Sequence, residues 1–105
     1  MYVEAYVRFE WDPEKARSNF AKHGVAFDVA ILVFDDPKAV ATFDRVYDGE
    51  ERWRTLGRVG VATILFVAHT WFDDGGEVHV RIISARRADK MEIRAYERGD
   101  EGHFR

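Results

Sequence analysis

Cysteine is absent from the 105-residue chain, and proline and methionine occur only twice each. Without a thiol the chain forms no disulfide, no thiolate metal site and no cysteine nucleophile, so a reducing compartment fits it. It also lacks a run of 18 apolar residues, and its first apolar stretch contains Glu4 and Arg8 and no small-residue cleavage site. We therefore expect a soluble cytoplasmic protein without a transmembrane helix or signal peptide.

The length and composition are those of one globular domain. Hydrophobic residues make up 47% of the chain and charged residues 33%, close to the average for soluble domains. A folded chain of this mass buries about two-thirds of the surface that the unfolded chain exposes. We therefore predict a single domain over residues 1–105, built on one core.

The charge is unevenly distributed. A net charge of −3 argues against a protein that coats nucleic acid through bulk positive charge. Residues 78–98, however, include 6 basic and 3 acidic residues. In the whole chain, 12 of the 16 basic residues are arginine. Because the planar guanidinium binds phosphate or carboxylate through two hydrogen bonds, this region is the candidate anion site, unless its arginines only solvate a strand and a helix.

Two helices are predicted in the first third of the chain. A helix over 13–23 begins after Asp12 as N-cap and ends at Gly24. Apolar residues at helical spacing predict a second, short helix over 27–34, which ends before Pro37.

The rest of the chain is predicted to be mostly strands. A short half-buried strand over 7–11 precedes the helices. Further strands are expected near 39–47, 51–59, 61–71 and 77–85, followed by a helix over 88–98. The strand near 61–71 is apolar on both faces and should be central, whereas the last strand alternates apolar residues with His79 and Arg81. That polar face is a candidate site.

Five short sequence blocks stand out along the chain. In order they are Phe9-Glu10-Trp11-Asp12, Asn19-Phe20-x-Lys22-His23-Gly24-Val25, Phe34-Asp35-Asp36-Pro37, Glu51-Arg52 and Arg81-Ile82-Ile83-Ser84-Ala85-Arg86-Arg87-Ala88. Together, in this order, they resemble the BrnT toxin family. They cover roughly residues 9–97. The resemblance assigns no role to residues 1–8 or to the tail after Gly99, and Trp71-Phe72 stands where a polar or charged pair is expected.

The resemblance implies an α+β, RelE-like fold, with an antiparallel β-sheet meander packed with two N-terminal helices and one C-terminal helix. It further implies a ribonuclease that inhibits translation and growth, and that a BrnA-like antitoxin neutralises. Such antitoxins dimerise through a DNA-binding domain, so the resemblance suggests a 2:2 heterotetramer that contacts promoter DNA only through the antitoxin. No membrane partner is expected.

Metal-independent RNA cleavage needs a base near the 2′-hydroxyl, cations around the phosphate and a proton donor for the leaving 5′-oxygen. Arg81 lies on the polar face of the last predicted strand, and Arg86 lies at the end of that strand. Both side chains can therefore reach one phosphate, and Ser84 is near enough to donate a hydrogen bond to it. The alternative is that the two arginines form ion pairs with Glu77, Asp89 or Glu92.

The other candidates each carry a second interpretation. Glu51 and Arg52 would act as a base and a phosphate clamp; the alternative is a surface ion pair. Lys22 and His23 would take part in proton transfer; the alternative is that they only stabilise a helix C-terminus. Tyr96 stacks on a base or helps proton transfer, or packs in the core.

No cofactor and no metal are expected. The histidines at positions 23, 69, 79 and 103 show no HxH or HExxH spacing. His69 ends an apolar strand and is more typical of a hydrogen-bonded core residue. Trp11, Trp53 and Trp71 would stack on bases only if exposed.

The hypothesis is therefore a metal-independent endoribonuclease toxin. Arg52, Arg81 and Arg86 would stabilise the phosphorane, and Glu51 or His23 would exchange protons. A catalytically silent module that binds an acidic protein partner or RNA is the alternative.

Overall fold

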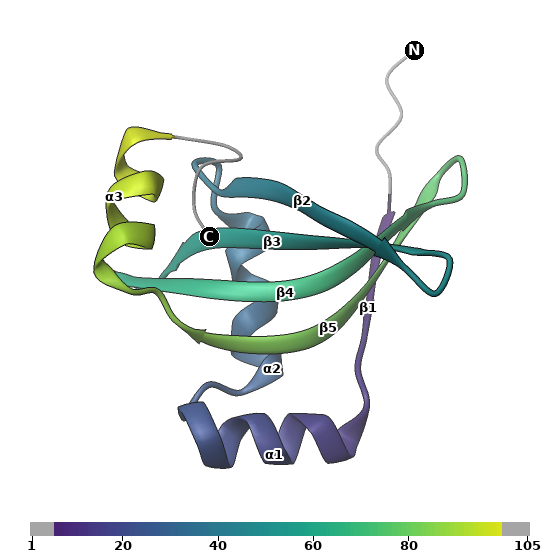
Figure 1. The fold of residues 1–105 in the computed structure, drawn as a ribbon, viewed down its shortest axis with the longest axis horizontal. Coiled ribbons are helices and arrows are strands. Elements are labelled where there is room, and N and C mark those ends of the chain that lie inside the picture. The colour runs from purple at the N-terminus through teal and green to yellow at the C-terminus, as the bar shows by residue number, and fades with distance from the viewer. Residues whose placement is uncertain (1–5, 100–105) are drawn as a thin grey trace.

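A five-stranded mixed β-sheet forms the centre of the molecule, with strand order β1-β5-β4-β3-β2 (Figure 1). The computed structural model describes residues 6–99. In chain order the elements are β1 (Tyr6–Glu10), α1 (Pro13–His23), α2 (Phe27–Ala30), the 3₁₀ helix η1 (Ile31–Asp35), β2 (Val40–Tyr47), β3 (Glu50–Val59), β4 (Thr63–Asp73), β5 (Glu77–Arg87) and α3 (Lys90–Arg98). No helix among the described residues is long and apolar enough to cross a membrane.

Strand β1 makes the sheet mixed. Strands β2 to β5 form the expected antiparallel meander, but β1 pairs in parallel with β5, with Phe9 opposite Val80. The prediction of a wholly antiparallel sheet is therefore wrong at this edge. After β1 the chain runs through α1, α2 and η1 and joins the sheet again at the opposite edge, as β2. Such a long crossover lets the first strand lie parallel to the last one.

The helix ends follow the capping residues. Asp12 accepts a hydrogen bond from the backbone N–H of Glu14 at 2.9 Å, and Gly24 ends α1 with φ +72°. This confirms the predicted helix over 13–23. The second predicted helix is α-helical only over Phe27–Ala30 and continues as η1. The last helix begins at Lys90 rather than at residue 88, because Asp89 is its N-cap in a complete capping box.

The strands lie close to the predicted ranges. Strand β3 begins at Glu50, one residue earlier than expected, because Asp48 and Gly49 alone form the turn after β2. Both turn residues have positive φ, the conformation that a two-residue hairpin turn favours. Strands β4 and β5 extend two residues beyond the predicted ends, to Asp73 and Arg87.

The core lies on both faces of the sheet. On one face α1, α2 and η1 cover a buried cluster that includes Phe27, Val33, Val67 and Val80. On the other face α3 covers one end through a second cluster. That cluster consists of Val40, Leu56, Ile64, Ala95 and Tyr96. Among residues 6–99, no other helix covers this second face (Figure 1).

Gly57 sets how closely η1 approaches the sheet. A Cβ atom at Gly57 would lie 2.6 Å from Val33 Cβ and 2.9 Å from the Val33 Cα and carbonyl oxygen. Two of these atoms are backbone, so no side-chain rotation can make room. Only glycine therefore allows η1 to pack at this distance from β3.

We predict that Gly57→Ala lowers the free energy of unfolding by roughly 1–3 kcal/mol, because the added methyl group overpacks this contact. Chemical denaturation monitored by circular dichroism measures the change. Gly76→Ala is the matched control, since a Cβ there meets nothing within 4 Å. Equal stability of the two variants would show that η1 does not depend on the missing side chain.

Candidate active site

A β-bulge in β5 determines which predicted residues share a face of the sheet. The pairing with β4 shifts between Ala68 and His69, which leaves one extra residue in β5. In a regular strand side chains alternate, and Arg81 and Arg86 would point to opposite faces. The extra residue turns Arg86 and Ser84 to the same side as Arg81. We call this side, opposite to α1, α2 and η1, the open face.

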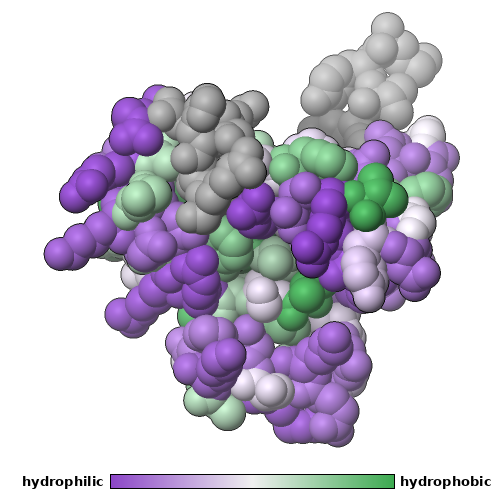
Figure 2. All heavy atoms as spheres, in the orientation of Figure 1, coloured by the Kyte–Doolittle hydropathy of each residue, from purple (hydrophilic) through white to green (hydrophobic). Residues whose placement is uncertain are grey.

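Arginines from four of the five strands occupy the open face. The strand register places there Arg8, Arg45, Arg52, Arg54, Arg58, Arg81 and Arg86. In the view of Figure 1, α2 lies behind the strands, so Figure 2 looks onto the open face. Hydrophilic side chains surround apolar atoms there (Figure 2). The anion site expected in the C-terminal third thus also draws on β1, β2 and β3.

Arg81 and Arg52 lie in one row across the sheet. Arg52 is directly opposite Thr70 on β4, and Thr70 Oγ1 accepts a hydrogen bond from the backbone N–H of Arg81 at 2.9 Å. The next row contains Arg54, Ala68 and Ser84. Neighbouring strands are separated by about 4.8 Å, so two arginines that flank one strand can converge on a single anion.

The Arg81 guanidinium is held by a carboxylate that the sequence analysis did not select. Its Nη1 and Nη2 donate to the two oxygens of Glu50 at 2.9 and 2.7 Å. This hydrogen-bonded pairing lowers the pKa of Glu50, which therefore stays ionised at neutral pH. Glu50 is the first residue of β3. The Asp48-Gly49 turn in the sequence could have indicated this, because a two-residue turn makes Glu50 the first residue of the next strand.

Glu51 and Arg52 do not act as a pair. Being consecutive in a strand, they point to opposite faces. Glu51 accepts a hydrogen bond from Trp53 Nε1 at 3.0 Å, whereas the guanidinium of Arg52 lies 4.8 Å from the centre of the Tyr47 ring. Among the described residues, the buried Nε of Arg52 has no hydrogen-bond partner. Because this atom is also shielded from solvent, it offers no donor to a ligand in this conformation.

Arg86 forms one of the ion pairs that the sequence analysis left open. Its Nη1 and Nη2 donate to Glu92 at 2.8 and 2.9 Å, and its guanidinium lies 4.1 Å from the centre of the Phe66 ring. Glu92 is 1% exposed and also accepts from the backbone N–H of Asp89. The hydrogen-bonded pairing raises the pKa of Arg86. The ion pair between Arg86 and Glu92 therefore holds the start of α3 against β5.

Tyr96 packs in the core, as its alternative interpretation stated. It is 6% exposed within the cluster under α3, and its hydroxyl donates to Asp36 at 2.6 Å. Burial and this hydrogen bond raise the pKa of Tyr96. Its hydroxyl thus links α3 to the end of η1.

Lys22 and His23 are not brought together with the arginines. They form the exposed last turn of α1, and α1 packs through Ala16 on the face opposite to the open one. The structure therefore separates these two predicted site residues from Arg81.

A cleft of about 800 Å³ opens beside the Arg81–Glu50 pair. Its lining includes Glu50, Trp53, Thr70, Trp71, His79 and Arg81. Trp53 and Trp71, which also line this cleft, are half-buried. Acidic side chains, among them Glu10 and Asp73, also line it. A phosphate is therefore favoured toward Arg52 and the other arginines rather than deep in the cleft.

His69 is a core residue. It is 1% exposed, its Nδ1 donates to the Thr70 carbonyl at 2.9 Å, and its Nε2 accepts from the Thr55 hydroxyl at 2.7 Å. Burial lowers its pKa to about 4. Within residues 6–99, no group of three or more His, Asp or Glu side chains is placed to hold a metal ion.

A family model and a solved structure match the chain. Residues 11–92 match the family model described as the ribonuclease toxin, BrnT, of a type II toxin–antitoxin system. The chain belongs to the BrnT toxin family. The fold is also similar to the crystal structure of the Brucella abortus ribonuclease toxin BrnT, with a TM-score of 0.53 and 24% sequence identity. That match covers 85% of this chain and 100% of the Brucella chain. A search of curated proteins found no match.

BrnT family membership confirms the assignment made from the five sequence blocks. The family is one of ribonuclease toxins in type II systems, so an antitoxin partner and an RNA substrate belong to the description of the family. The matched range, 11–92, includes Glu50, Arg52, Arg81, Ser84 and Arg86. All the arginines of the open face except Arg8 therefore lie within the matched part of the chain.

We predict that His69 makes stability depend on pH between about 6.5 and 4. The unfolded state binds a proton in this range and the folded state does not, so the free energy of unfolding falls as the pH falls. A pKa lowered from 6.5 to about 4 corresponds to roughly 3 kcal/mol lost by pH 4.

Urea denaturation of the wild type and of His69→Gln across this pH range measures the effect. Because carboxylates titrate in both proteins, the difference between the two curves isolates His69. A difference that stays constant with pH would contradict the prediction.

Proposed function

We propose that this chain cleaves RNA at the open face by attack of a 2′-hydroxyl on the adjacent phosphate, without a metal ion. The observation that supports it is the row formed by Arg52, Thr70 and Arg81, with the Glu50 carboxylate at its side. The row supplies two cations for one phosphate, and Glu50 supplies a base within reach of that phosphate.

Arg52 and Arg81 stabilise the charge that develops on phosphorus. A guanidinium has five N–H donors, and Glu50 uses one on each of the two terminal nitrogens of Arg81. The remaining donors of Arg81, together with the terminal N–H groups of Arg52, can bind the equatorial oxygens of a phosphorane. Ser84, on the same face and half-buried, adds a hydroxyl donor.

Glu50 takes the role expected of Glu51 or His23. Its ionised carboxylate removes the proton from the 2′-hydroxyl, the 2′-oxygen forms a bond to phosphorus, and the bond to the 5′-oxygen breaks. The products are a 2′,3′-cyclic phosphate and a 5′-hydroxyl. Arg86, on β5, acts on this site only indirectly, through the ion pair with Glu92 that holds α3 against β5. Lys22, His23 and Tyr96 have no part in the proposed reaction.

Metal independence is supported by the residues around the arginines. The described part of the chain offers no cluster of metal ligands, and guanidinium groups already supply the positive charge that a metal would bring to the phosphate.

We predict that Arg81→Ala and Arg52→Ala each reduce RNA cleavage at least about tenfold, equal to roughly 1.4 kcal/mol of transition-state stabilisation. Cleavage of a labelled oligoribonucleotide in buffer with excess EDTA measures the rates, and the wild type should remain fully active there.

Arg17→Ala is the control, because this exposed arginine of α1 forms an ion pair only with Glu14 of its own helix among the described residues. Wild-type rates in both open-face variants would remove the phosphate site. Loss of wild-type activity in EDTA, restored by one metal, would overturn the mechanism. RNA that binds without being cut would favour the silent binding module.

We also propose that a BrnA-like antitoxin covers the open face in a 2:2 complex and blocks RNA entry. The arginines there favour an acidic partner, and blocking requires only that antitoxin and RNA overlap. Charge attraction mainly speeds association, whereas buried contacts slow dissociation.

Coexpression with the product of the neighbouring gene, followed by size measurement and a cleavage assay, tests this complex. We expect a tight complex without activity, and an association rate that falls as salt is added. A neighbouring product that binds while cleavage continues would exclude this mode of neutralisation.

A further inference from the structure

We propose that His79 is the general acid that protonates the leaving 5′-oxygen. The inference rests on the cleavage reaction proposed above and adds a catalytic residue that the sequence analysis gave no role. It depends on where His79 lies relative to Arg81, and on which of its nitrogens is engaged.

His79 belongs to the same side of the sheet as the phosphate site. It precedes Arg81 by two residues in β5, so both side chains point to the open face, about 6.6 Å apart along the strand. Both residues also line the cleft beside Glu50. The His79 side chain is 30% exposed, which leaves the imidazole accessible to a substrate.

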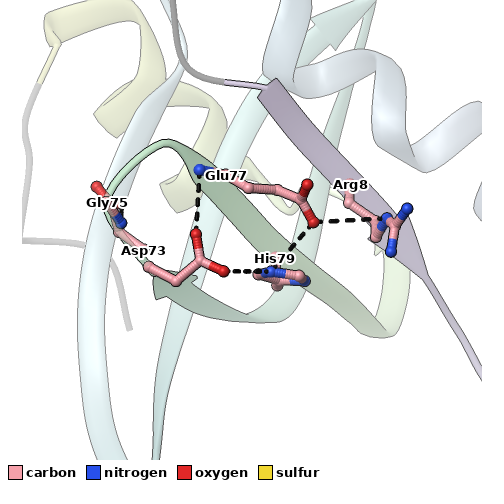
Figure 3. A network of polar contacts seen from close by, with 6 residues as sticks. Arg8, Asp73, Gly75, Glu77 and His79 are labelled. Atoms are coloured by element: carbon pink, nitrogen blue, oxygen red, sulfur yellow. Dashed lines mark hydrogen bonds and ion pairs between the residues drawn. The ribbon is translucent and has the colours of Figure 1, made fainter.

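Two carboxylates hold the His79 ring by one nitrogen. Nε2 lies 3.1 Å from Asp74 Oδ2 and 3.2 Å from Glu77 Oε1 (Figure 3). Both neighbours are hydrogen-bond acceptors, so Nε2 carries a proton. A carboxylate on one imidazole nitrogen fixes the ring and leaves the other nitrogen for chemistry. In His79 the nitrogen left for proton exchange is Nδ1.

Other charged groups surround His79 and its two carboxylate partners. Arg8 on β1 is opposite His79 in the register and lies 3.7 Å from Glu77 (Figure 3). Glu10 and Asp73 line the same cleft as His79, and on β4 the uncharged Phe72 ring lies 6.0 Å from the imidazole centre. The hydrogen bond from His79 lowers the pKa of Asp74, so this carboxylate stays ionised.

Glu50 and His79 come from strands on opposite sides of β4. Glu50 begins β3, His79 is in β5, and the guanidinium of Arg81 reaches from β5 to Glu50. In-line attack requires a base near the entering oxygen and an acid near the leaving one. Glu50 removes the 2′-proton, the P–O5′ bond breaks, and Nδ1 of the imidazolium gives its proton to the 5′-oxygen. His79 is left neutral and still donates from Nε2 to Asp74.

A substrate that needs no acid tests this role. We would compare cleavage of an oligoribonucleotide with that of the same molecule carrying sulfur in place of the bridging 5′-oxygen, because a thiolate leaves without protonation. We expect His79→Gln to slow cleavage of the oxygen substrate about 10²-fold or more, and of the sulfur substrate by less than about threefold. Arg81→Ala should slow both.

Asp74→Asn tests the positioning residue. We expect a smaller loss on the oxygen substrate, a changed alkaline limb of the pH–rate profile, and near-normal cleavage of the sulfur substrate. Asp28→Asn, on α2 at the opposite face, is the matched control for the loss of a carboxylate and should keep the wild-type rates. An Asp74→Asn profile identical to that of the wild type would overturn the positioning role.

A measurement on the wild-type protein does not depend on the folding of a variant. Nitrogen-15 NMR of the imidazole should show the neutral His79 ring protonated at Nε2, and an Nδ1-protonated ring would overturn the proposal. So would equal slowing of both substrates in His79→Gln. Failure of the wild type to cut either substrate would instead refute the cleavage reaction itself.

Discussion

The extra residue in β5 is the feature on which the open face depends. It places Arg81, Ser84 and Arg86 on one side of the sheet and turns Ala85 into the core on the other side, where it is 0% exposed. From α1, Asn19 donates to the Ala85 carbonyl at 2.8 Å and accepts from its N–H at 3.1 Å. Pairing with β1 ends at Arg81, so Asn19 satisfies backbone groups that a neighbouring strand would otherwise bind.

Two bidentate arginine–carboxylate pairs lie at opposite ends of the open face and differ in how far they are buried. Arg86 and Glu92 lie at the end that α3 covers, where Glu92 is buried and removal of its partner would leave an uncompensated charge. Arg81 and Glu50 lie at the uncovered end, where side-chain exposures of 36% and 41% admit solvent and ligand. The same geometry therefore stabilises the fold at one end and, at the other, holds the partly exposed cation and carboxylate to which we assign the reaction.

The sequence predicted best what local chemistry decides. Asp12 and Gly24 defined α1, since capping needs only neighbouring residues. The parallel pairing of β1 depends on a strand about 70 residues away, and no local pattern shows it. The bulge does break the alternation of β5, since apolar residues stand at even positions up to Ile82 and at odd positions from Ile83, but the sequence analysis did not use this change of phase. Glu51 was selected with Arg52 as one of the five sequence blocks, whereas the face on which Glu50 or Glu51 lies depends on strand register, which a shift of one residue reverses.

The division between the two faces has a consequence for how mutations act. On the helical face, Val33 contacts Gly57, and Asn19 bonds to Ala85, so changes there act on stability. On the open face, Arg52 and Arg81 are partly exposed and contribute little to the core, so their removal should have little effect on stability. Arg86 connects the two faces' effects, because its loss leaves Glu92 without its partner and also removes a cation from the open face. Reduced cleavage in an Arg86 variant therefore identifies a catalytic role only if α3 stays in place.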